Sequence, residues 1–79
     1  MTLNDLRNTF SGETRFFLQS SYTEEEFEIN NLLWGTPGFA DMTFSKAKAA
    51  SKNIVVIRIG LPYRIFEAYK EYSKGNDEN

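Results

Sequence analysis

Residues 54–59, which read Ile-Val-Val-Ile-Arg-Ile, decide the fold of this 79-residue chain. Five of the six side chains are β-branched aliphatics, and such side chains pack well on the pleated surface of a sheet. Apolar residues fall on both faces of the expected strand, apart from Arg58 near its end, as they do in strands that are covered on both sides. The stretch therefore predicts a central strand with structure packed on each of its faces.

Helices are expected on both sides of this strand in the sequence. After it, Pro62 suits the first turn of a helix, and Gly75 suits the position just past the end. Apolar residues at helical spacing are expected to face the core: Ile65, Ala68, Tyr69 and Tyr72. Before the strand, three alanines between Ser45 and Lys52 are strong helix formers. Thr43 or Ser45 is expected to cap a short helix there, which runs to Lys52.

The N-terminal half predicts a helix and a strand, followed by a segment with two interpretations. Thr2 and Asp5 fit the capping box of a short helix over residues 2–10, which Ser11 and Gly12 would stop. The aromatic run in residues 14–20 predicts a strand. Residues 22–29 then form either the second strand of a hairpin, because apolar and acidic residues alternate, or a helix that begins with a capping box. A turn of helix over residues 30–34 fits either version.

This order of elements predicts an α+β fold. We expect one compact domain over residues 1–74, in which a small sheet of about three strands is flanked by two or three helices, and a disordered tail over residues 75–79.

The composition excludes most familiar chemistry. The chain has neither histidine nor cysteine, so the commonest general base, the commonest metal ligand and every thiolate nucleophile are absent. We therefore expect no enzyme activity, no catalytic residue, no cofactor and no metal site. No apolar run is long enough to cross a membrane, and the N-terminus does not read as a signal peptide, so a cytoplasmic location without membrane contact is expected.

Charge is distributed unevenly and suggests two surfaces for partners. Residues 1–44 hold two arginines and seven carboxylates, whereas residues 45–79 hold seven basic residues and four carboxylates. The front half contains an acidic cluster that could take the place of a row of phosphates on a protein partner: Glu24, Glu25, Glu26 and Glu28. The rear half contains a basic set that would suit a nucleic-acid backbone: Lys46, Lys48, Lys52, Arg58 and Arg64. The sequence pI of about 5.0 argues against nucleic acid.

A rigid loop with aromatic residues on either side is a third candidate surface. Trp34 and Phe39 flank the Gly-Thr-Pro-Gly stretch of residues 35–38, where they either anchor a protein partner or fold back onto the core.

The chain also resembles a broad group of short proteins from bacteriophages and integrative elements. The resemblance lies in Leu3-x-x-Leu6, the Ser-Gly-Glu-Thr of residues 11–14, an aromatic strand, a polar hairpin and the late strand of residues 54–59. It implies an accessory or anti-defence protein, such as a CRISPR inhibitor, that occludes a host protein. Together these features predict a non-enzymatic protein–protein interaction module. A small nucleic-acid-binding domain and a structural homo-oligomer are the alternatives.

Overall fold

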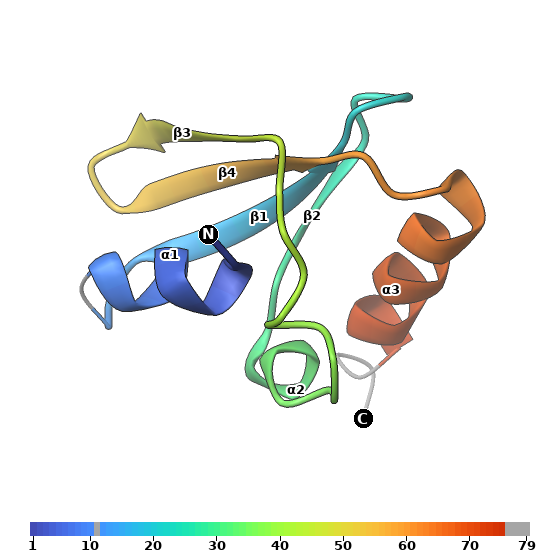
Figure 1. The fold of residues 1–79 in the computed structure, drawn as a ribbon, viewed down its shortest axis with the longest axis horizontal. Coiled ribbons are helices and arrows are strands. Elements are labelled where there is room, and N and C mark those ends of the chain that lie inside the picture. The colour runs from blue at the N-terminus through green and yellow to red at the C-terminus, as the bar shows by residue number, and fades with distance from the viewer. Residues whose placement is uncertain (11, 76–79) are drawn as a thin grey trace.

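The computed structural model describes residues 1–10 and 12–75, which form one mixed sheet and three helices (Figure 1). Along the chain the elements are α1 (Leu3–Thr9), β1 (Arg15–Ser20), β2 (Glu26–Glu28), α2 (Asn31–Trp34), β3 (Lys46–Ser51), β4 (Ile54–Ile59) and α3 (Tyr63–Gly75). The α+β class is confirmed. The expected stop at Ser11 and the tail of residues 76–79 lie outside the described residues.

The sheet has the strand order β2-β1-β4-β3. Its centre is a parallel ladder in which all six residues of β1 pair with all six of β4, from Arg15 with Ile54 to Ser20 with Ile59. Antiparallel neighbours flank this centre, with β2 beside β1 and β3 beside β4. Of the two interpretations of residues 22–29, the hairpin is therefore correct, and α2 supplies the turn of helix that follows it.

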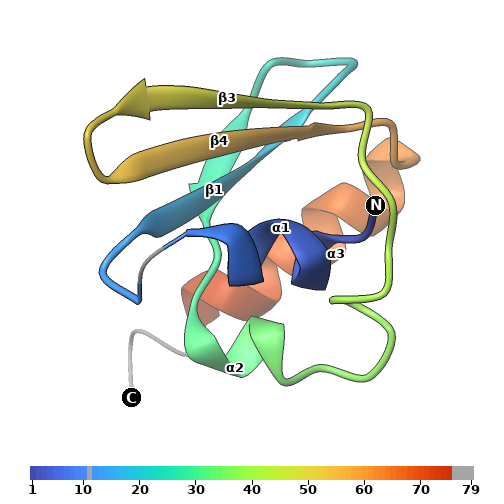
Figure 2. The same ribbon diagram turned by 60° about the vertical axis from the view of Figure 1, so that its left-hand side comes forward.

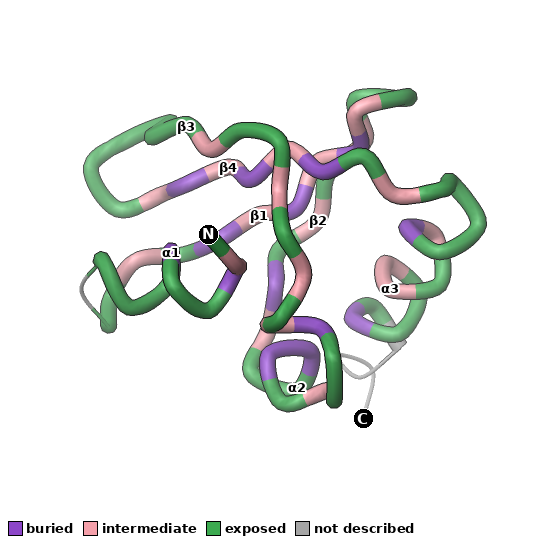
Figure 3. The backbone as a smooth tube through the Cα atoms, in the orientation of Figure 1, coloured by how far each residue is buried: buried purple, intermediate pink, exposed green. Residues whose placement is uncertain are grey.

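Within the described part of the chain, all the helices lie on the same side of the sheet (Figures 1 and 2). Side chains of the two central strands alternate between this covered face and the opposite one. On the covered face they build the core with residues of the helices. Figure 3 shows where along the backbone the buried residues lie. The strand contribution to the core is Phe16, Leu18, Val55, Ile57 and Ile59. The prediction that β4 is central is right, but the prediction that both its faces are covered is wrong.

Residues 46–51 form a strand, not the predicted helix. The alanines favour a helix, but this preference amounts to only a few tenths of a kcal/mol for each residue. As a strand, the segment pairs with β4 from Lys46 opposite Arg58 to Ser51 opposite Ile54, and so satisfies the backbone groups on that side of β4. Thr43 caps no helix; it forms an isolated bridge with Thr2 instead.

The core-facing side of α3 differs in part from the prediction, because Tyr69 packs against the core as expected but Ala68 is exposed. Phe66 and Ser73 are buried and Tyr69 is partly buried, whereas Ile65 and Tyr72 are 43% and 46% exposed. The two faces are adjacent on the helix, and the ring of Phe66 packs near that of Phe27, with 5.3 Å between centroids. Phe66, which is fully buried, therefore decides the orientation of the helix.

Candidate functional site

One face of the sheet carries no helix in the described structure, and we call it the helix-free face. Its side chains follow from the strand register, because residues that pair across a ladder point to the same face. From one edge to the other they are Glu26 and Glu28 on β2, Arg15, Phe17 and Gln19 on β1, Ile54, Val56 and Arg58 on β4, and Lys46 and Lys48 on β3. The face thus changes from acidic at the β2 edge to basic at the β3 edge.

Three cations gather at the β3 side of this face, and we call them the basic corner: Lys46, Lys48 and Arg58. Lys46 and Arg58 are directly opposite each other on neighbouring strands, and like charges in such a pair repel and destabilise the sheet. None of the three has a carboxylate within 4 Å among the described residues, where the ion pairs are Arg15–Glu28 and Lys70–Glu25. The corner is therefore a local excess of positive charge that the described chain does not neutralise.

A groove of about 420 Å³ runs beside the basic corner. Gln19 and Val56 line it on the central strands, between the lysines of β3 and Glu26 of β2, and Glu24 of the turn before β2 also lines it. The groove therefore presents cations along one wall and carboxylates along the other. A ligand that carries negative charge would be attracted to the β3 side of the groove and repelled from the β2 side.

The other two members of the predicted basic set lie elsewhere. Lys52 is in the turn between β3 and β4, and Arg64 is in the first turn of α3, on the other side of the molecule's sheet. The five residues therefore do not form one nucleic-acid face. Only the basic corner brings three of them together. Arg58 lies on the strand that was predicted for it, whereas Lys46 and Lys48 lie on a strand where a helix was predicted.

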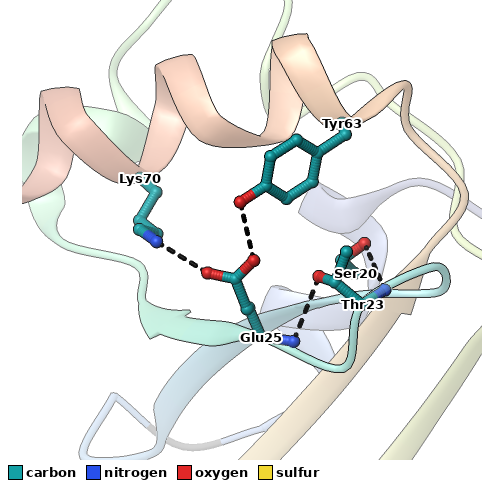
Figure 4. A network of polar contacts seen from close by, with 5 residues as sticks. All are labelled: Ser20, Thr23, Glu25, Tyr63 and Lys70. Carbon is teal, nitrogen blue, oxygen red and sulfur yellow. Dashed lines mark hydrogen bonds and ion pairs between the residues drawn. The ribbon is translucent and has the colours of Figure 1, made fainter.

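The acidic cluster is divided by ion pairs within the chain. Glu25 accepts hydrogen bonds from Tyr63 Oη at 2.7 Å and Lys70 Nζ at 2.8 Å (Figure 4). The hydrogen bond from Lys70 is the largest cause that lowers the pKa of Glu25, and the hydrogen bond from Tyr63 is the second. Glu28 forms a two-point contact with Arg15, at 2.9 and 2.7 Å, which lowers the pKa of Glu28. Only Glu24 and Glu26 keep their charge unpaired, so the expected row of four carboxylates is not presented.

The turn between β1 and β2 holds these carboxylates in place. The hydroxyl of the buried Ser20 accepts a hydrogen bond from the backbone amide of Tyr22. It accepts another from the Thr23 amide, and the Glu25 amide donates to Thr23 Oγ1 (Figure 4). Glu24 adopts a left-handed backbone conformation with φ of 64°, which is uncommon for a residue with a side chain. The turn directs Glu24 and Glu25 apart, with one toward the groove and the other toward α3.

Trp34 and Phe39 fold back onto the core. They are 9% and 0% exposed and pack edge to face with 5.7 Å between ring centroids. Phe39 also contacts Tyr69 of α3, with 5.2 Å between centroids. A fully buried side chain cannot anchor a partner without opening the core, so of the two interpretations of this loop the structure supports packing.

The structure also contains contacts that the sequence analysis missed. The guanidinium of Arg7 lies 4.8 Å from the centre of the Trp34 ring and borders a second groove, of about 540 Å³. The contacts of Glu25 with Tyr63 and Lys70 join residues far apart in sequence, so no local spacing could have indicated them. For the basic corner a signal did exist, namely the alternation of Lys46 and Lys48, but it indicates one face only if the segment is a strand.

Two classes of site are not found in the described residues. No group of three carboxylates is placed to hold a metal ion in residues 1–10 and 12–75. No helix in this part of the chain has the length and apolar character needed to cross a membrane. A comparison with known protein families, with curated proteins and with solved structures finds no match to the chain.

Proposed function

We propose that this chain is a small non-enzymatic protein-interaction module that binds its partner through the helix-free face of the sheet. The observation that carries the proposal is the basic corner. Lys46 lies opposite Arg58 with Lys48 beside them, and no described carboxylate lies within 4 Å of any of the three. Repulsion of this kind costs free energy in the isolated domain and is relieved when a partner brings negative charge to the site.

The partner class we propose is a protein and not a nucleic acid. A nucleic-acid strand that crossed the face would meet Glu24 and Glu26 in the same groove as the lysines, and phosphates are repelled by carboxylates. A protein can match a face of mixed sign, because it carries charges of both kinds. The resemblance to phage and mobile-element proteins makes a bacterial host protein that is occluded by this face the first partner to test.

Affinity capture with matched baits tests the proposal. The wild-type chain, a K46E/K48E variant and an R64E/K74E variant are immobilised and exposed to a lysate of the cells that carry the gene. The two variants have the same net charge, but R64E/K74E changes only α3. We expect quantitative mass spectrometry to find a protein that the wild type and R64E/K74E retain and that K46E/K48E loses.

Two results would contradict the proposal. If the three baits retain the same proteins in the same amounts, the basic corner is not a binding surface. If nuclease treatment removes what K46E/K48E loses, and a salt titration shows the steep dependence of phosphate contacts, the site binds nucleic acid.

A further inference from the structure

The outer edge of β3 is open. β3 is the last strand of the sheet, and no other described segment pairs with its outer side (Figure 2). In an antiparallel ladder, alternate residues direct their N–H and C=O groups away from the neighbouring strand. The register of β3 against β4 shifts between Ala49 and Ser51, so the regular part of the strand is residues 46–49. This part presents an unpaired row of backbone donors and acceptors, which is a template for another strand.

The opposite edge of the sheet is different. β2 has only three residues, and α3 packs beside it. The Ser73 hydroxyl donates to the Glu28 carbonyl at 3.0 Å, and Lys70 contacts Glu25 just before the strand. The β2 edge is thus short and partly occupied, whereas the β3 edge is long and bare.

We propose that β3 accepts an extended acidic segment of a partner protein as a fifth strand. This inference rests on the proposed function, because it names the partner chemistry of the same basic corner. Lys46 and Lys48 point to the helix-free face, so carboxylates at alternate positions of the added strand would lie beside them. Ala47 and Ala49 point to the other face, where their small side chains leave room for apolar residues of the partner. The expected ligand alternates acidic and apolar residues.

Distance decides which charges on the face matter to such a strand. Neighbouring strands are about 4.8 Å apart, so the added strand would lie one spacing from the lysines and about 19 Å from β2. Salt at physiological concentration screens exposed charges beyond about 8 Å. Attraction by the lysines therefore acts on the ligand, and repulsion by Glu26 and Glu28 does not reach it.

The same charges argue against two other occupants. A second copy of this chain paired through β3 would bring lysines beside lysines, which repel. A nucleic acid has no backbone amides with which to continue the ladder, so it would use the lysines alone and leave the strand edge unpaired. An acidic extended peptide can pair with the open backbone edge of β3 and also bring negative charge to its lysines.

The test uses a labelled synthetic peptide of alternating glutamate and valine. Fluorescence anisotropy is measured with the wild-type chain, with K46E/K48E and with R64E/K74E as the matched charge control. We expect the wild type and R64E/K74E to bind equally, and K46E/K48E to bind about tenfold more weakly, because two exposed ion pairs are replaced by repulsion. A peptide in which glutamine replaces every glutamate is expected to lose affinity in the same way.

Backbone pairing is tested separately from charge. Methylation of the peptide nitrogens at one set of alternate positions removes the N–H groups that face β3, and methylation of the other set does not. We expect one methylated peptide to lose binding and the other to retain it, and hydrogen exchange of the wild-type β3 amides to slow when the unmodified peptide binds.

Three results would overturn strand addition. In the first, both methylated peptides bind as well as the parent, although K46E/K48E loses its captured protein; the helix-free face then binds a partner, but not through the β3 edge. In the second, the glutamate peptide does not bind the wild-type chain, whether or not the affinity capture finds a protein partner. In the third, an oligonucleotide of matched length competes with the peptide and binds more tightly.

Discussion

At the scale of single residues, Glu25 connects the sheet to the longest helix. Its carboxylate takes a hydrogen bond from Tyr63 and an ion pair from Lys70, which lie two turns apart on α3. Both contacts favour the ionised form and lower its pKa from the ordinary value of 4.5. Glu67 and Glu25 in turn stabilise the protonated phenol and raise the pKa of Tyr63.

We expect Glu25→Gln to lower the melting temperature near neutral pH and to have no effect in acid. A carboxylate with a depressed pKa stabilises the folded state above its unfolded-state pKa, and that stabilisation is lost as the pH falls through the folded-state value. The difference in melting temperature between wild type and E25Q should therefore narrow below pH 4.5 and vanish at lower pH. Thermal melts followed by circular dichroism over this range provide the measurement.

The control for this prediction is Glu13→Gln, since Glu13 is exposed and takes part in no ion pair that the structure describes. E13Q should have the same melting temperature as the wild type at every pH. If E25Q and wild type differ equally at neutral and acid pH, the carboxylate charge is not what joins β2 to α3.

At the scale of elements, the predictions that succeeded rest on local patterns. The β-branched run of residues 54–59 and the capping box of Thr2 and Asp5 both appear as expected, the latter with the Asp5 amide bonded to Thr2 Oγ1 at 3.2 Å. The prediction for β3 failed because the local preference of this segment for a helix opposes its tertiary role as a partner of β4. The basic corner was missed with it, since Lys46 faces Arg58 only once residues 46–51 are extended.

The conflict within β3 predicts opposite effects for one substitution at two sites. Ala49→Val should stabilise the protein by about 0.5 kcal/mol, because valine has a higher propensity than alanine for an exposed strand position. Ala68→Val, at an exposed position of α3, should destabilise it by a similar amount, because valine is a weaker helix former. Urea denaturation of the two variants against wild type measures both. Equal signs for the two changes would mean that residues 46–51 are not held as a strand in solution.

At the scale of the whole molecule, the two lysines of β3 also keep the open edge from pairing with itself. Charged side chains, and lysine above all, are a common protection of exposed edge strands. The isolated chain carries a net charge of −2, which is at the low end of the range that keeps small domains apart. The position of the lysines on the open edge therefore adds protection that the overall charge supplies only weakly.

Replacing both lysines by threonine should promote self-association. K46T/K48T removes the charges and adds β-branched side chains that favour strand pairing. Sedimentation velocity over a range of concentrations should show larger species than for the wild type, and the matched variant R64T/K74T should behave as the wild type does. The idea fails if both double variants associate to the same extent.

The parallel ladder at the centre of the sheet has a consequence for how the chain acquires its structure. Each residue of β1 pairs with a residue of β4 that lies about half the chain away, and the hairpin of β1 and β2 is too small to be stable alone. Contacts between such distant segments slow folding, because the entropic cost of closing the intervening loop comes before the contacts can form. During synthesis the N-terminal half therefore has no sheet to join until β4 has emerged. A product that stops before Ile54 would lack the centre of the fold and would expose Phe16 and Leu18 to proteases.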